Sequence, residues 1–355
     1  MSRPVADPFV KGDFAAALLA WFDVHGRHDL PWQLNRSAYT VWVSEIMLQQ
    51  TQVTTVIGYF EKFISKFPDV STLANAPLDD VLALWAGLGY YARARNLHKA
   101  AGVVRDAHDG IMPADIESLI ALPGIGRSTA GAIASLAWDK RAPILDGNVK
   151  RVLSRRVGMT EWPGGTQALK QLWLLAEELT PHERVADYTQ AIMDLGATLC
   201  TRAKPLCMHC PVSEGCVALR DGLQGRIPAP KPKVHRPRRS VRMLVLQNTA
   251  GAVLLERRPA AGVWPGLFSL PELPEDTSAG DWSRAHVGSD IADERALAPI
   301  SHAFTHFDLD IEPLRAMLSS SAGVLEHADR LWYKPGEPQR PGMPAPVARL
   351  LDTLA

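Results

Sequence analysis

Apolar residues recur every three or four positions through the first two thirds of the chain, a spacing typical of amphipathic helices. The clearest stretches are FAAALLAWF (14–22), LDDVLALWAGL (78–88), TAGAIASLAW (129–138) and ALKQLWLLAEELT (168–180). Pro and Gly residues separate such stretches, for example at 112–113, 123–126 and 163–165. The pattern predicts a mostly helical domain over residues 1–225, with no strand before residue 240.

The pattern changes in the segment RIPAPKPKVHRPRRS (226–240). Its four prolines and six basic residues build no hydrophobic core and predict an extended linker. Beyond it, VRMLVLQ-NTAG-AVLLER (241–257) has the pattern of a β-hairpin. We therefore expect the chain to continue as a second, separate domain.

Alternation of apolar and acidic residues marks FDLDIEPL (307–314) as a strand, with Phe307, Leu309 and Ile311 on one face. PVARLLDTLA (346–355) predicts a short closing helix. Residues 241–355 therefore read as a smaller domain that mixes helices and strands.

Composition narrows the class of protein. The 355 residues are 46% hydrophobic and 21% charged, which excludes a disordered or collagen-like chain. The chain has no run of about 18 apolar residues, and its N-terminus lacks the apolar core of a signal peptide. We expect a cytoplasmic protein with no membrane association.

The formal net charge is zero, with 38 basic and 38 acidic side chains, but the charge is unevenly distributed. Residues 1–225 sum to −1, residues 226–242 to +7 and residues 243–355 to −6. Basic side chains also gather at 140–156 and, beside two tyrosines, at 89–105. Basic residues interleaved with aromatics favour a surface that grips a nucleic-acid backbone over a merely solvated face.

All four cysteines lie within one short segment, with the spacing Cys200-x6-Cys207-x2-Cys210-x5-Cys216. A secreted disulfide scaffold would spread its cysteines along the chain, so this grouping indicates a metal or cluster site in a reducing compartment. The spacing fits neither paired zinc knuckles nor the ferredoxin patterns, and it leaves structural zinc and an iron–sulfur cluster both open.

A glycine-rich turn, LPGIGRSTAGA (122–132), separates two helical stretches. Gly124 and Gly126 allow a close backbone approach, and the next helix begins near Arg127 and Ser128 with its free N–H groups directed at the turn. Two helices joined in this way make a helix-hairpin-helix that grips a DNA phosphate without reading sequence. The alternative is an ordinary tight turn between two helices.

Glu45 is the only charged residue in VWVSEIMLQQTQV (41–53), and helical spacing predicts that it shares a face with Gln49 and Gln52. That face either points to solvent or lines an apolar cleft. In a cleft, desolvation would raise the pKa of the carboxyl, and Glu45 could act as a general acid.

Asp146 precedes Gly147 and a helical stretch, so it is a favoured N-cap. Capping is compatible with catalysis, because a carboxylate that accepts backbone N–H groups stays ionised. One protonated and one ionised carboxyl form the division of labour that cleaves glycosidic bonds through an oxocarbenium-like transition state.

Together these motifs resemble the helix-hairpin-helix DNA glycosylases with an iron–sulfur cluster, and more narrowly the A/G-specific adenine glycosylases (the MutY proteins). The resemblance rests on VWVSEIMLQQTQV, GLGYYARARNLHKAA, LPGIGRSTAGAI, LDGNVKRVL and the cysteine spacing, and it covers nearly the whole chain. It implies a catalytic domain over residues 1–225, the linker 226–240 and a Nudix-like domain over 241–355. It also implies one [4Fe–4S] cluster held by the four cysteines of the loop 200–216.

The resemblance further implies that Glu45 protonates adenine, that Asp146 stabilises the sugar cation and that Asn148 supports Asp146. The base must first be flipped out of the duplex, because the bond cannot be attacked within the stack. Gln50 and Tyr90 match positions that wedge into the duplex, and Gly124, Gly126, Arg127, Ser128 and Lys150 match DNA contacts. Trp32, Gln33, Leu48 and Gln190 match positions near the flipped adenine.

Two features separate this chain from the related endonuclease III enzymes, which also cut the DNA strand. Those enzymes carry a lysine nucleophile where this chain has Ser128, and a hydroxyl cannot form an imine. Lys150 offers only an inefficient substitute, so we expect a glycosylase with weak lyase activity or none.

The second feature is the C-terminal domain, which endonuclease III lacks. GVWPGLFSLPEL (262–273) and HAFTHFDLDI (302–311) resemble the domain that recognises 8-oxoguanine opposite the adenine. Phe304, Thr305 and His306 stand where the family typically has Phe-Ser-His. No acidic run for Mg²⁺ is present in the sequence, which favours reading DNA over hydrolysing nucleotides.

The leading hypothesis is a monomeric enzyme that removes adenine opposite 8-oxoguanine or guanine in double-stranded DNA. The alternatives are a glycosylase/lyase of the endonuclease III kind and a non-catalytic DNA-binding protein whose cluster senses redox state. The Pro-rich linker is a candidate docking segment for a sliding clamp or a mismatch-repair protein. Inside a bacterial cell we expect the protein at the nucleoid.

Overall fold

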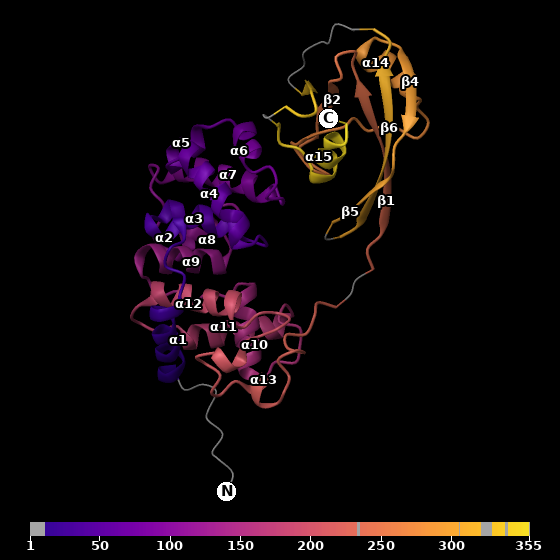
Figure 1. Ribbon diagram of the computed structural model, residues 1–355. Coiled ribbons are helices and arrows are strands. Elements are labelled where there is room, and N and C mark those ends of the chain that lie inside the picture. The colour runs from indigo at the N-terminus through magenta and orange to yellow at the C-terminus, as the bar shows by residue number, and fades with distance from the viewer. Residues whose placement is uncertain (1–10, 233–234, 305, 321–328, 338–339, 355) are drawn as a thin grey trace. The chain divides into compact units, whose positions relative to one another are not determined.

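The structure is a computed structural model that describes residues 11–232, 235–304, 306–320, 329–337 and 340–354 (Figure 1). These residues group into two compact units. One unit draws on residues 1–76 and 95–233, and the other on residues 77–94 and 234–355. None of the described helices is both long and apolar enough to cross a membrane.

The first unit is built from helices, as its apolar spacing predicts (Figure 1). Its elements are α1 (Lys11–His25), α2 (Pro31–Leu34), α3 (Ala38–Leu48), α4 (Val53–Lys66), α5 (Val70–Asn75), α7 (Ala92–Ala107), α8 (Ile116–Ala121), α9 (Arg127–Trp138), α10 (Gly147–Val157), α11 (Thr166–Leu179), α12 (Val185–Thr198), the 3₁₀ turn η1 (Cys207–His209) and α13 (Val217–Arg220). The stretch that groups with the second unit contains α6 (Leu78–Leu84).

Helix ends follow local chemistry. Ser37, Asp69, Asp115 and Asp146 each accept a backbone N–H in the first turn of the helix that follows, which satisfies a donor with no partner inside the helix. The expected helix over 78–88 is shorter, because α6 ends at Leu84 and turns follow.

The region after Glu45 differs from the expectation. The helix α3 ends at Leu48, Gln50 has a left-handed backbone with φ 60°, and Gln52 is the N-cap of α4. Gln52 therefore does not share a helix face with Glu45, and the prediction of one continuous polar stripe is wrong. A β-branched and polar sequence, TQVTT, favours a break here over continuation of the helix.

Two glycines let the central helices approach closely. The helix α9 packs on α3 and α12, and α12 also packs on α10. A Cβ at Gly131 of α9 would lie 2.5 Å from the carbonyl oxygen of Pro143, and a Cβ at Gly196 of α12 would lie 2.6 Å from Cβ of Asn148. These approaches fix the segment that leads into α10.

The second unit is organised around one mixed sheet (Figure 1). Its elements are β1 (Arg238–Gln247), β2 (Val253–Arg257), β3 (Phe268–Ser269), α14 (Ala279–Val287), β4 (Ile291–Ala296), β5 (Ile300–Ala303), β6 (Asp308–Leu318), β7 (Arg330–Tyr333) and α15 (Ala345–Asp352). The strand order is β3-β2-β1-β6-β4, with β5 paired to β6 and β7 paired to β2. The predicted hairpin is present, because β1 and β2 pair antiparallel, while β1 and β6 run parallel.

Alternate residues of β1 enter two different cores, because side chains along a strand point to opposite faces. Met243 and Val245 pack in one core with α15, and Leu244 and Leu246 pack in the other with α14. Leu309 and Ile311 of β6 lie in the core that contains α15, and Phe307 packs against it. The predicted face of this strand and the closing helix are thus confirmed, as is the mixed α+β class.

A buried ion pair ties the start of the first unit to α12. Asp194 is fully buried and accepts hydrogen bonds from Nε (3.0 Å) and Nη2 (2.5 Å) of Arg27 and from its backbone N–H (2.8 Å). The amide of Gln190 donates a further bond of 2.7 Å. Removal of the carboxylate charge would leave several buried donors without an acceptor.

We predict that Asp194→Asn lowers the free energy of unfolding by about 3 kcal/mol, measured by urea denaturation followed by far-UV circular dichroism. Asp23→Asn is the matched control, because Asp23 also pairs with an arginine, Arg184, but its side chain is 49% exposed against 1% for Asp194. The control should change stability by about 0.5 kcal/mol at most. Equal effects of the two substitutions would contradict this account.

Candidate active site

Glu45 lies in the last turn of α3, among the buried residues Ser44, Ile46 and Met47. Its side chain is half-buried and keeps a partial opening to solvent. Desolvation by the surrounding protein raises its pKa from 4.5 to about 8, and the nearby charge of Asp146 adds to the rise. Glu45 therefore carries its proton at neutral pH, which favours the cleft over a solvent-facing stripe.

Asp146 is the N-cap of α10, and its Oδ1 accepts the backbone N–H of Val149 at 2.8 Å. Burial nevertheless raises its pKa, although hydrogen bonds from the backbone of Val149 and Asn148 and the charges of Arg151 and Lys150 act in the opposite direction. The shift is opposite in direction to the one that the capping hydrogen bonds alone would give, because burial has the larger effect.

The residues around Asp146 are held from both sides. Before it, the backbone N–H of Leu145 donates to Oγ of Ser128 at 2.9 Å. After it, Oδ1 of Asn148 accepts from Arg151 at 2.8 Å, and Arg151 also donates to the carbonyl oxygens of Gly196 and Cys200, both at 2.7 Å. Sequence reasoning counted Arg151 only among the basic residues of 140–156 and did not identify these partners.

The glycine-rich turn joins α8 to α9 as predicted. Gly124 has φ 84°, and a Cβ there would lie 2.8 Å from Cβ of Asn96, so glycine is required. Gly126 is the N-cap of the 12-residue helix α9, with no side chain covering the first N–H groups. The exposed side chain of Arg127 lies over the ring of Trp173, with its guanidinium carbon 3.9 Å from the ring centroid.

The four cysteines are half-buried free thiols, and burial raises the pKa of Cys210 to about 11. Within the part of the chain that the structure describes, no three His, Cys, Asp or Glu side chains are placed to hold a single metal ion. The donor set and its surroundings still fit an anionic cluster, because buried cations from α10 face the loop. Arg155 donates to Sγ of Cys200 at 3.3 Å, and Arg156 donates to carbonyl oxygens of Val212 and Glu214.

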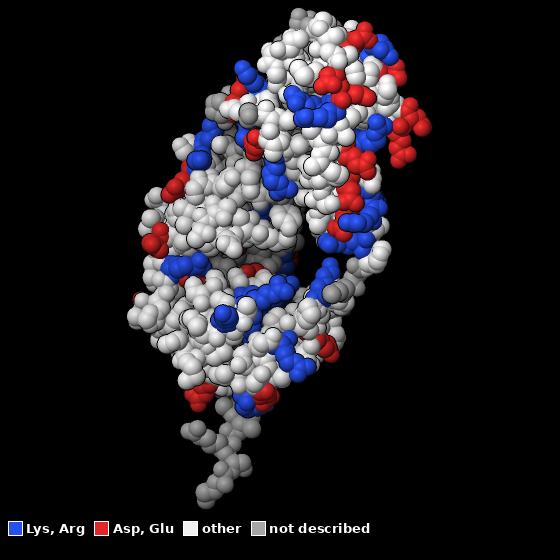
Figure 2. All heavy atoms as spheres, turned by 45° about the vertical axis from the view of Figure 1, so that its right-hand side comes forward, with Lys and Arg blue, Asp and Glu red and all other residues white. Residues whose placement is uncertain are grey.

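A basic groove of about 1050 Å³ begins at the first turn of α10, beside Asp146. Its lining includes Lys150, Arg151, Trp162, Arg202, Arg226 and Lys231, and none of the described residues that line it is acidic. Figure 2 shows Lys and Arg side chains gathered on this side of the helical unit. The groove can hold a polyanion, and its lining begins at Gly147, the residue after Asp146.

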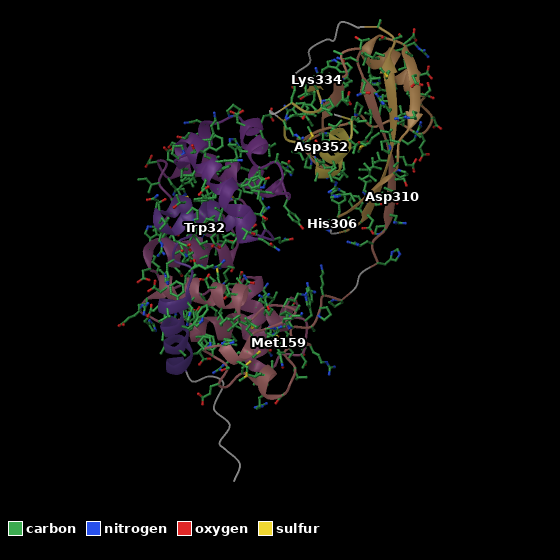
Figure 3. All side chains as sticks on the ribbon, viewed as in Figure 1. Trp32, Met159, His306, Asp310, Lys334 and Asp352 are labelled. Atoms are coloured by element: carbon green, nitrogen blue, oxygen red, sulfur yellow. The ribbon has the colours of Figure 1, made fainter. Side chains whose placement is uncertain are left out.

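The four residues expected near the flipped base lie on three helices, two of them on α2 and one each on α3 and α12. Trp32 of α2 is buried, edge to face with Phe60 at 5.3 Å, and Figure 3 marks its position. Leu48 ends α3, Oε1 of Gln33 accepts a weak bond from the N–H of Leu30 at 3.4 Å, and Gln190 donates to Asp194. No distance ties these four to Glu45, so their role stays a prediction.

The two expected wedge residues share an unusual backbone. Gln50 (φ 60°) and Tyr90 (φ 51°) are both left-handed although neither is glycine, and both side chains are exposed. Left-handed non-glycine residues are uncommon and occur in turns or at functional sites. The sequence contains no signal for this conformation.

In the second unit, Phe304 stacks on Phe307 with ring centroids 4.6 Å apart, and His306 is exposed (Figure 3). Thr305, the third residue of the expected lesion-reading triplet, lies outside the described residues.

Comparison with known proteins finds a matching family for each of the two units. Residues 43–178 match the family described as HhH-GPD superfamily base excision DNA repair protein, and residues 242–353 match the family described as NUDIX domain. A solved structure titled as a thermostable thymine-DNA glycosylase is 29% identical, with a TM-score of 0.52 over 59% of this chain and 95% of that one. A solved endonuclease III–DNA complex, 21% identical with a TM-score of 0.51, shares the fold over the same fractions of the two chains.

Curated relatives extend the similarity along the chain. The adenine DNA glycosylase of Buchnera aphidicola subsp. Acyrthosiphon pisum (strain APS) is 38% identical over 96% of this chain and 97% of its own length. The adenine DNA glycosylase of Homo sapiens is 48% identical over 58% of this chain and 39% of its own length. The chain therefore belongs to the family of adenine DNA glycosylases, enzymes of base-excision repair that remove adenine from DNA.

Proposed function

We propose that this glycosylase removes adenine paired with 8-oxoguanine or guanine, with Glu45 as general acid and Asp146 as the stabiliser of the sugar cation. The observation that carries the proposal is the pair of neighbouring half-buried carboxyl groups, in which the pKa of Glu45 is raised to about 8 beside Asp146. Protonation of the adenine ring makes it a better leaving group, and a negative charge beside the sugar lowers the energy of the oxocarbenium-like state.

Asp146 suits the second role because its partners keep the carboxylate oriented. The N–H groups at the start of α10 hold it at one end, and Asn148, through Arg151, fixes the same turn against α12. Only one of two adjacent buried carboxyl groups can ionise easily, so an ionised Asp146 helps to keep Glu45 protonated.

Ser128 argues for base removal without efficient strand cleavage. Its hydroxyl accepts the N–H of Leu145 and cannot form an imine with a sugar aldehyde. Lys150 lies one turn into α10 and is the nearest amine along the chain to Asp146, so any lyase activity should be slow.

The features of the first unit fit contacts to the phosphate backbone of DNA better than contacts to base edges that read its sequence. The open N-terminus of α9 offers N–H groups to one phosphate, and the basic groove offers five cations to others. We infer that the mispaired duplex is held along these two features, with affinity that falls steeply as salt rises.

The four cysteines would hold one [4Fe–4S] cluster, supported by the donor set and by the buried Arg155 and Arg156 that face it. When bound, the cluster supplies a rigid cross-link for the loop 200–216 and no step of the base removal. This chain's own Arg202 would thereby be fixed at the wall of the basic groove.

Recognition of the base opposite the adenine belongs to the second unit in this proposal. Phe304 and His306 lie between β5 and β6, and the exposed His306 is available to a base. The ring of Phe304 is stacked on that of Phe307.

We predict that Glu45→Gln lowers the single-turnover rate of adenine release at least a hundredfold while binding of the duplex is retained. The substrate is a duplex with adenine opposite 8-oxoguanine, labelled on the adenine strand. Glu61→Gln is the matched control, because Glu61 is an exposed glutamate of α4 and should leave the rate unchanged. A Glu45→Gln enzyme as active as the control would remove the assigned role from Glu45.

The same assay separates the alternatives. We expect wild-type product that breaks only after treatment with alkali, because the enzyme leaves an abasic site. Direct strand breaks would instead support a glycosylase/lyase, and binding without product would support a non-catalytic DNA-binding protein.

We predict that purified protein shows broad visible absorption with iron and acid-labile sulfide in equal amounts, and that Cys210→Ser abolishes it. His209→Ala is the control, because His209 lies between two of the cysteines and is not an assigned ligand. Stoichiometric zinc and no visible absorption would contradict the cluster.

A further inference from the structure

The turn between β2 and β3 carries an aromatic residue in a strained backbone. Gly262 (φ 95°), Trp264 (φ 53°) and Gly266 (φ 72°) are all left-handed. Two glycines adopt this conformation easily, but a bulky side chain rarely does, and it persists only where the surroundings impose it. Two backbone hydrogen bonds close the turn. The N–H of Gly266 donates to the carbonyl oxygen of Arg258 at 3.1 Å, and the N–H of Leu267 donates to that of Trp264 at 3.2 Å.

The strained backbone places the indole ring of Trp264 against the segment that precedes β6. Its centroid lies 5.7 Å from that of Phe304 and 5.8 Å from that of His302. The rings of His302 and Phe304 meet edge to face at 4.6 Å, and Phe304 stacks on Phe307. These separations and tilts are those of favourable aromatic pairs.

Two arginines, Arg236 just before β1 and Arg239 within it, contact the same segment. Nη1 of Arg236 donates to the carbonyl of Phe304 at 3.3 Å, and the guanidinium of Arg239 lies 4.5 Å from the ring centroid of Phe307. The N–H of Phe304 also donates to the carbonyl of Phe307 at 2.8 Å. The backbone at Phe304 is thus held by polar contacts, and its ring is held by the rings of Trp264, His302 and Phe307.

We propose that Trp264 is a specificity-determining positioning residue, which fixes the ring of Phe304, one of the residues proposed to read the base opposite the adenine. This inference rests on the proposed function. Trp264 and Phe304 are both partly buried against the same core, and in this proposal Trp264 acts through Phe304. Without the indole, the ring of Phe304 would have to be ordered when the duplex binds. This entropic cost would weaken binding of the duplex that contains 8-oxoguanine.

The test compares adenine removal opposite 8-oxoguanine with removal opposite guanine, as the ratio of the two kcat/KM values in the full-length enzyme. Trp264→Leu keeps apolar bulk against the core but has no ring, and we expect the ratio to fall roughly tenfold through KM for the 8-oxoguanine duplex. Trp264→Phe restores a ring and should keep the ratio near that of the wild type. The thermal unfolding midpoints of both variants show whether the second unit remains folded.

An unchanged ratio in Trp264→Leu would overturn the proposal, and so would an equal loss on both duplexes, because a merely structural residue affects both. A lowered ratio in Trp264→Phe together with an unchanged ratio in Trp264→Leu would also overturn the proposal. A wild-type enzyme without preference for 8-oxoguanine would contradict lesion recognition itself, and the role of Trp264 with it.

Discussion

In the proposed mechanism, the chemistry depends on keeping two carboxyl groups close together in a partly desolvated site. Glu45 and Asp146 belong to different helical segments, and burial raises the pKa of both. Between pH 4.5 and about 8 the folded protein holds a proton on Glu45 that the unfolded chain releases, so this group's contribution to stability falls as pH rises through that window. The fold must supply the compensating contacts elsewhere.

Those contacts come from the packing of α9, α10 and α12. Gly131 and Gly196 allow the backbones to approach, Ser128 holds the residue before Asp146, and Arg151 ties the turn after it to α12 and to Cys200. The cysteine loop is therefore joined to the same helix that begins with Asp146. Its proposed cluster would stabilise the start of α10 as well as the loop itself.

Motif chemistry and helical periodicity predicted much of this arrangement. The helix start at Arg127, the N-cap at Asp146, the hairpin after the linker and the apolar face of β6 all follow from local residue patterns that the structure confirms. The fold class is confirmed too. It could be predicted because the spacing of apolar residues and the composition both change near the boundary between the two domains.

Tertiary effects could not be predicted from local patterns. The left-handed Gln50, the early end of α3 and the upward pKa shift of Asp146 depend on what packs around them. The same holds for Arg151 and Trp264, whose contacts join residues far apart in the sequence. Neither residue belongs to a motif that points to its partners.

Direct titration of Glu45 tests the central claim most sharply. Carbon-13 carboxyl NMR on glutamate-labelled protein, with the resonance assigned by its absence in Glu45→Gln, gives the pKa of this one group. We predict titration near pH 8, with a lower value in Asp146→Asn because a neighbouring negative charge is removed. Titration near 4.5 in the wild type would contradict the account, because Glu45 would then carry no proton to donate at neutral pH.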